Sequence, residues 1–170
     1  MVLGFRDLIM AKLTVGKGIS QYTKALESLG QECEEMCGRA IFEGAAIIAD
    51  AIKAEISSMT VYANTEKGKK KGLNHFEREG LIAGLGISKM QNDNGTFNVK
   101  IGEDGYNAHK TDKYPNGHPN AMIAHAVERG TSFMPKNPVF TRATKAYSAS
   151  AEKAMGEELD KQIEQTMNKA

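Results

Sequence analysis

VERGTSFMPKNPVF, residues 127–140, connects the polar middle of the chain to a long predicted helix. Gly130 follows the end of an apolar run, a position that favours a left-handed backbone conformation. Pro135 and Pro138 have a fixed φ and bias the residues before them towards extended geometry. The stretch also contains four apolar side chains, Phe133, Met134, Val139 and Phe140. It therefore predicts a stiff elbow that buries apolar side chains and holds the following helix at a set angle.

The helix predicted after the elbow covers Pro138–Lys169 and carries an apolar residue at every fourth position. This stripe consists of Tyr147, Ala151, Met155, Leu159, Ile163 and Met167. An α-helix has about 3.6 residues per turn, so a repeat of four drifts by about 40° at each step. The stripe therefore spirals around the helix, which favours oblique packing against another helix or a curved, ring-like neighbour.

A second long helix is predicted for residues 19–58, where apolar residues keep helical spacing. At about 1.5 Å per residue this helix approaches roughly 60 Å, more than a compact domain of this size needs. Gly30, Gly38 and Gly44 each cost up to about 1 kcal/mol relative to Ala. Packing against other elements or subunits must offset that cost, or the helix kinks or breaks at these glycines.

The middle of the chain predicts a short helix followed by a β-hairpin. Residues 74–84 suit the helix. The hairpin joins Leu85–Met90 to Thr96–Ile101 through Asn92-Asp93-Asn94-Gly95, a strong turn signal. One face of the second strand carries the apolar residues Phe97, Val99 and Ile101, the alternation expected of a half-buried strand.

Residues 102–118 predict a long, projecting polar loop, of a length that is usually functional or disordered in a compact domain. Pro119 is expected at the first position of a helix that covers Asn120–Arg129, with a strand as the alternative. Residues 1–18 are interpreted as an N-terminal arm. Together these elements predict a single α+β domain, residues 1–170, with two long α-helices packed beside a small antiparallel β-sheet and long polar loops.

The composition is that of an ordinary soluble globular protein, with 41% hydrophobic and 25% charged residues. Only 6% of the residues are aromatic, so the core is predicted to be aliphatic, with Met and Ala filling gaps. The formal net charge of +1 argues against an overall nucleic-acid-binding surface, while a local basic patch remains open. No run reaches the roughly 18 apolar residues that cross a bilayer, so no membrane partner is expected.

Two sets of residues are candidates for a metal site: Cys33 with Cys37, and His109, Asp112 and His118 in the polar loop. These residue types bind metals, but their spacing matches no compact zinc motif. The two cysteines fit an apolar stripe and project from the same helix, so we expect reduced thiols rather than a disulfide. A solvated loop is the favoured interpretation of the histidines, and a metal-dependent enzyme is the less favoured alternative.

The other polar candidates also have plain structural interpretations. His125 is expected to be buried and hydrogen-bonded or to lie at an interface. A solvated face is expected for His75, Glu77 and Glu79. Ser132 lacks the Gly-x-Ser-x-Gly pattern of a nucleophile elbow. We therefore assign no catalytic, metal-binding or cofactor-binding residue, and we expect neither a cofactor nor an enzymatic activity.

A basic run, interrupted by glycine, consists of Lys67, Lys69, Lys70 and Lys71. Such a run suits contact with DNA phosphates where a genome passes through a ring. It lacks interleaved aromatic residues, and phosphate contact needs only charge and is therefore unspecific. A solvated loop is the favoured interpretation, with a DNA-facing role as the alternative.

The elbow sequence also resembles a known family. Its acidic residue, Gly-Thr-Ser, aromatic residue and Met-Pro, followed by Pro-x-Phe at the start of a terminal helix, are similar to the neck or tail-component family of long-tailed bacteriophages. The resemblance extends to a long N-terminal amphipathic helix and to a Gly-Leu-x-x-x-Leu-Gly-Ile-Ser-Lys-Met segment near residue 80. A strand and a Pro-Asn-Gly loop follow in the family's order.

This resemblance implies a small, non-enzymatic virion protein that joins the head connector to the tail. It implies a homo-oligomeric ring, expected to be a hexamer, that is made in the host bacterial cytoplasm and binds head-completion, connector and tail proteins. The residues expected at the subunit or partner interface are Glu128, Arg129, Gly130, Thr131, Ser132, Phe133, Met134, Pro135, Pro138, Phe140, Tyr147 and Met155. The alternative is a non-viral helical adaptor that binds a protein partner through the same helices.

Overall fold

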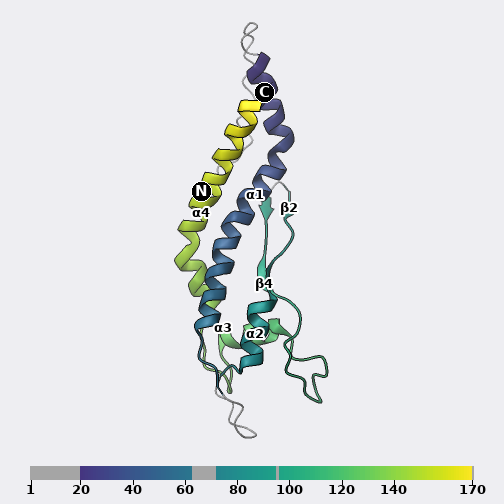
Figure 1. Ribbon diagram of the computed structural model, residues 1–170, viewed down its shortest axis with the longest axis vertical. Helices are drawn as coiled ribbons and strands as arrows, with labels where there is room; N and C mark the ends of the chain where they lie inside the picture. The colour runs from purple at the N-terminus through teal and green to yellow at the C-terminus, as the bar shows by residue number, and fades with distance from the viewer. Residues whose placement is uncertain (1–19, 63–71, 95, 170) are drawn as a thin grey trace.

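The computed structural model describes residues 20–62, 72–94 and 96–169. Within them lie four helices, α1 (Ser20–Ser58), α2 (His75–Gly84), α3 (Asn120–Arg129) and α4 (Val139–Lys169), and the strands β1 (Leu85–Ile87), β2 (Gln91–Asp93), β3 (Thr96–Asn98) and β4 (Ile101–Glu103). α1 and α4 run side by side and antiparallel, while α2 and α3 gather at one end (Figure 1). The predicted α+β class is confirmed. The predicted N-terminal arm, residues 1–18, and the lysine run at 67–71 lie outside the described residues.

A core of buried residues joins the helices at one end of the molecule, which we call the base. Ile56 of α1, Leu81 of α2, Val127 of α3 and Val139 of α4 are fully buried in this core. The elbow contributes Met134. The buried residues of this core are aliphatic or Met, as the composition predicted.

Beyond the base, α1 and α4 continue as a two-helix arm, which we define as residues 29–48 of α1 and 148–168 of α4 (Figure 1). α1 is continuous through its three glycines. A Cβ atom on Gly44 would lie 2.6 Å from Cγ of Met155, so Gly44 allows α4 to approach α1 closely. Packing at Gly44 therefore offsets the conformational cost of that glycine, which is the first of the two outcomes expected from the sequence.

The predicted hairpin is present, but its pairing is split into two short ladders. β1 pairs with β4 from Leu85↔Glu103 to Ile87↔Ile101, and β2 pairs with β3 from Gln91↔Asn98 to Asp93↔Thr96. Only two residues separate β2 from β3, and Asn94 has a left-handed φ of 54°. The predicted four-residue turn was therefore too wide, because Asn92 and Asp93 pair within the ladder.

The segment after β4 is a folded loop. β4 extends to Glu103, so the predicted loop start at residue 102 was two residues too early. Asn107 is buried, and its side-chain oxygen accepts hydrogen bonds from the backbone N–H groups of His109 (3.0 Å) and His118 (3.1 Å). Residues 104–118 still project to the side of the base (Figure 1). A buried asparagine thus organises a loop for which the sequence predicted no internal structure.

α3 forms as a helix, so the alternative strand prediction for this segment was wrong. Pro119 precedes the first helical residue with an extended ψ of 128°, one position earlier than predicted. At the other end, Gly130 has a φ of 78°, and its N–H donates to Ala126 O at 2.9 Å. α3 therefore ends on a glycine with positive φ, as the elbow sequence predicted.

The elbow, residues 130–138, is closed by backbone hydrogen bonds and fixes the start of α4. Thr131 N donates to Met134 O at 2.8 Å, and Asn137 N donates to Val127 O at 2.8 Å. The carboxylate of Glu128 accepts hydrogen bonds from the N–H groups of Phe140 and Thr141, both at 3.1 Å. A carboxylate at this end of a helix is stabilised by the unpaired N–H groups and the helix dipole. Glu128 therefore caps α4 within its own chain.

We predict that Gly130→Ala lowers the free energy of unfolding by about 1–3 kcal/mol. The backbone conformation of φ 78° and ψ 159° suits glycine almost alone, and a Cβ would lie 3.0 Å from Lys136 N. Gly156→Ala is the matched control, since nothing lies within 4 Å of its Cβ position inside α4. Urea denaturation should show this control to be neutral or up to about 1 kcal/mol more stable. Equal effects of the two substitutions would contradict the requirement for glycine at position 130.

Candidate functional site

The elbow presents one exposed aromatic ring on a buried support. Phe133 is 58% exposed, at the tip of the turn that Thr131 and Met134 close. Met134 is buried in the core beneath it. The N–H of Phe133 donates to Thr131 Oγ1 at 3.2 Å, which further restrains the turn. The turn therefore presents Phe133 to solvent from a restrained backbone.

The predicted interface residues divide by burial. Arg129, Thr131, Ser132, Phe133, Pro135 and Tyr147 are exposed; Glu128, Gly130, Pro138, Phe140 and Met155 are half-buried; Met134 is buried. Met134 and Phe140 pack on the core, and Glu128 caps α4, so these three side chains serve the fold of their own chain. The exposed group remains available to a partner.

The two helices of the arm cover each other incompletely. On α4 the buried positions near the far end are the polar residues Gln162 and Thr166, and Thr166 Oγ1 lies 3.0 Å from Glu32 Oε2 of α1. Leu159, Ile163 and Met167 are only half-buried. The apolar stripe, which repeats every four residues, has thus drifted away from the line of contact with α1, as its period predicted. Large aliphatic side chains remain partly exposed along the arm.

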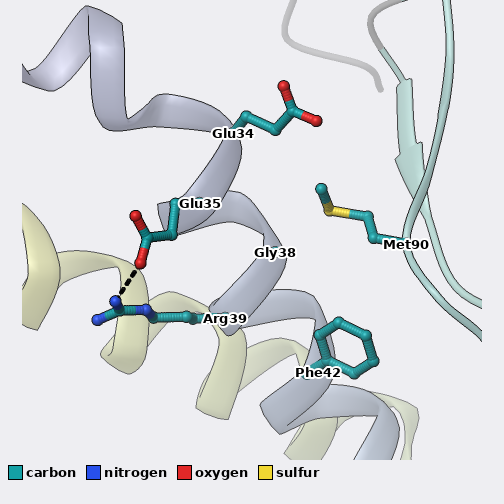
Figure 2. A pocket seen from close by; sticks show the side chains of 6 residues that line it. All are labelled: Glu34, Glu35, Gly38, Arg39, Phe42 and Met90. Carbon is teal, nitrogen blue, oxygen red and sulfur yellow. Dashed lines mark hydrogen bonds and ion pairs between the residues drawn. The ribbon is translucent and has the colours of Figure 1, made fainter.

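A shallow apolar groove lies where the hairpin runs beside α1, and we call it the arm groove. Its lining consists of Glu34, Glu35, Gly38, Arg39, Phe42 and Met90. Figure 2 shows Met90 pointing from the hairpin towards α1, with Glu34 and Phe42 on the same side of the helix. The Sδ of Met90 lies 3.3 Å from the position of a Cβ on Gly38. Gly38 therefore leaves room for the thioether, and Phe42, 39% exposed, forms a wall.

Of the three charged residues that line the arm groove, two form an ion pair and one does not. Glu35 and Arg39 form an ion pair that Figure 2 shows pointing away from Met90. Glu34 has no ion-pair partner within the described parts of the chain, and its carboxylate is exposed. The groove therefore combines an apolar floor with one uncompensated negative charge at its rim. Sequence reasoning missed this groove, although Gly38 marked a gap in the side-chain cover of α1.

The histidine loop folds against α2. A capping box starts α2: Glu77 N donates to Asn74 Oδ1 at 2.9 Å, and Asn74 N donates to Glu77 Oε2 at 3.0 Å. Glu77 is fully buried, and its Oε1 lies 3.8 Å from Nδ1 of His118. The predicted solvated position of Glu77 is wrong because the loop covers this face of α2. His75 and Glu79 are exposed as predicted.

The rings of the loop contact one another. The centroid of His118 lies 4.6 Å from that of Tyr114 and 5.5 Å from that of His109, which in turn lies 6.0 Å from that of Phe76. His109 and His118 are half-buried, so the prediction of freely solvated histidines is wrong, whereas Asp112 is exposed. Within the described residues, no three His, Cys, Asp or Glu side chains form a group that would hold a metal ion.

The remaining candidates, Cys33, Cys37 and His125, lie outside the elbow and the histidine loop. Cys33 and Cys37 are free thiols with their Sγ atoms 4.0 Å apart, and burial together with the charge of Cys33 raises the pKa of Cys37 to about 11. His125 lies on the exposed face of α3, so the buried alternative for it is wrong and the interface alternative stays a prediction. We therefore assign no site to these three residues.

A buried carboxyl group that sequence reasoning missed lies at the end of β4. Neither oxygen of Glu103 has a hydrogen-bond partner among the described residues, and burial raises the pKa of Glu103 to about 7. A Cβ on Gly84 would lie 3.1 Å from Glu103 Oε2 and 2.5 Å from Asn120 Nδ2. Gly84 therefore lets the carboxyl group and Asn120 pack closely on α2. Nothing in the sequence around Glu103 distinguishes it from a solvated strand end.

We predict that Glu103 contributes a loss of stability between pH 4.5 and pH 7, because it stays protonated in the folded state over this range. The ordinary pKa of 4.5 applies to the unfolded chain, which therefore releases the proton first as the pH rises. Allowing for solvent around the half-buried side chain, the loss is about 1–2 kcal/mol. Glu103→Gln should remove it in urea titrations at about pH 3.5 and about pH 8 (each about one unit outside the window), whereas the exposed control Glu79→Gln should not. An unchanged pH dependence in Glu103→Gln would contradict the assignment.

None of the helices in the described ranges combines the length and hydrophobicity that crossing a membrane requires. Comparison of the chain with models of protein families, with curated proteins and with solved structures finds no match. The surfaces of the chain are therefore the basis for assigning a function.

Proposed function

We propose that the protein is a structural component of a long-tailed bacteriophage, a neck or tail-completion protein that joins the head connector to the tail. It acts by binding, as one subunit of a closed ring that we expect to be a hexamer. The observation that carries the proposal is the arm, whose aliphatic side chains are only half covered by its own two helices.

The physical argument concerns the length of the helices relative to the core. α1 has 39 residues and therefore spans roughly 58 Å, whereas a compact domain of 170 residues has a radius of gyration of roughly 15 Å. Two helices bury one stripe each, so large side chains beside that stripe remain in contact with water. A neighbouring subunit that covers them gains apolar burial of about 25 cal/mol per Å².

The elbow supports the same proposal, because it fixes the direction of α4 relative to the base. Glu128 caps α4 and the backbone bonds of residues 130–138 leave the connection little freedom. A rigid angle between base and arm is what a ring requires, since each subunit must repeat the same rotation for the ring to close. The elbow is also the part of the chain with the most specific resemblance to the phage family.

The test is deletion of the gene from the phage or prophage that encodes it. We expect heads and tails to accumulate separately, and electron microscopy to show joined particles again when the gene is supplied in trans. Mass spectrometry of purified virions should detect the wild-type protein. Normal infectious virions from the deletion would contradict the proposal and would favour a cellular adaptor that uses the same helices.

A further inference from the structure

We propose that the exposed ring of Phe133 inserts into the arm groove of a second copy of the chain. This interface rests on the ring-forming function proposed above and names the contact that joins neighbouring subunits. It uses two surfaces that lie apart along the molecule, the elbow at the base and the arm groove about midway along α1. No residue in either surface has a predicted catalytic role.

The two surfaces are complementary in shape and chemistry. Phe133 is 58% exposed, and hydrogen bonds restrain the backbone of its turn, so its burial costs little additional backbone entropy. The groove offers the ring of Phe42 and the thioether of Met90, which lies over Gly38. Aromatic rings pack favourably on other rings and on methionine sulfur. A held aromatic side chain that enters an apolar pocket is typical of residues that dominate binding energy.

The charges beside the two surfaces are opposite in sign. Arg129 and Lys136 are both exposed, and the backbone of Lys136 packs next to Gly130, which places the two residues on either side of the turn. Neither has an ion-pair partner in the portion of the chain that is described. Glu128 is half-buried and directed at the start of α4, so the exposed charges nearest Phe133 in the sequence are the two positive ones. The rim of the arm groove is negative at Glu34, so the contact brings unlike charges together.

The contact can form only between different molecules. Gly38 in the groove lies 18 residues from Ile56 on α1, a separation of roughly 27 Å along the helix. Ile56 shares the base core with Met134 of the elbow, so the groove and the elbow stay far apart within one chain (Figure 1). A contact between two different surfaces is heterologous, and repetition of such a contact builds a ring when the rotation closes.

The first test compares matched substitutions by sedimentation of the full-length protein. Phe133→Ser and Phe42→Ser are each expected to weaken association roughly 30-fold, the effect of losing a central binding residue. Tyr106→Ser is the control, because Tyr106 is a 61% exposed aromatic residue that lies on neither surface. Glu34→Lys should also weaken association, and Arg129→Glu in the same chain should restore part of it. Circular dichroism should show unchanged folding in each variant.

The second test is cross-linking in a chain that carries Cys33→Ser and Cys37→Ser. Ser132→Cys beside Phe133 and Arg39→Cys in the lining of the arm groove leave both contact rings in place, and both positions are exposed. The two together should give a ladder of products with a short bis-maleimide reagent, whereas either one alone should not extend beyond a dimer. Mixing the two single variants should give a cross-linked pair.

Two results would overturn the inference in distinguishable ways. If the wild-type chain forms a ring but Phe133→Ser associates as tightly as wild type and no ladder appears, the contact is wrong and the ring function stands. If the wild-type chain stays monomeric at every concentration, the ring and this contact both fail.

Discussion

Ile56→Ala is expected to lower the free energy of unfolding by about 3 kcal/mol, within the range of 2–5 kcal/mol measured for buried isoleucines. Ile56 is 0% exposed and lies in the core that joins α1 to the elbow and to α3. Its truncation removes apolar contacts and leaves a cavity that rigid neighbours fill only in part. Because a domain of this size is stable by only about 5–15 kcal/mol, the loss should be plain in urea denaturation.

Ile163→Ala in the arm is the matched comparison. Ile163 is half-buried beside α1, so in dilute protein the same truncation should cost less than about 1 kcal/mol. At high protein concentration, where neighbours cover the arm, the cost should rise. Equal costs for Ile56→Ala and Ile163→Ala in dilute protein would show that the arm already has a complete core of its own.

Glu77→Ala is expected to lower the free energy of unfolding by about 2–4 kcal/mol, the second large effect. The substitution leaves the N–H of Asn74 buried without its acceptor, and it removes the carboxylate that lies beside His118. The start of α2 and the loop of residues 104–118 should loosen together. Hydrogen exchange should therefore be faster in that loop as well as in α2.

The control for Glu77→Ala is Glu79→Ala, an exposed carboxylate on the same helix, with an expected effect below about 0.5 kcal/mol. Glu77→Gln retains an acceptor for Asn74 N, so it should lose less than Glu77→Ala. If hydrogen exchange in residues 104–118 is unchanged in Glu77→Ala, the coupling between α2 and the loop is absent.

The elements with strong local signals were predicted well. The stripes of α1 and α4 have helical periodicity over many turns, and the elbow carries glycine and proline where their backbone preferences are needed. The hairpin was also predicted, although its turn was placed too widely. Each of these signals depends on residues that are close to one another in the sequence, which is why the sequence alone reveals them.

The features that the sequence did not reveal depend on contacts between distant segments. Glu77 resembles a solvated residue until the loop some 40 residues later covers it. Glu55 and Arg142, 87 positions apart, form an ion pair across α1 and α4 with Nε–Oε1 at 2.9 Å, which lowers the pKa of Glu55 through hydrogen bonding. The arm groove likewise needs the hairpin to lie on α1. The spacing of residues along the chain does not indicate which distant residues come into contact.

The central claim is that the arm of this protein is completed by further copies of the chain. The most direct measurement is the mass of the full-length protein in solution, by native mass spectrometry or sedimentation, from dilute protein to roughly 100 µM, a range that covers micromolar association. The account predicts a concentration-dependent shift from the 18.5 kDa monomer to one closed oligomer, with the arm amides becoming more slowly exchanging as it forms. An 18.5 kDa species throughout that range, with arm amides already as protected as those of the base, would contradict it.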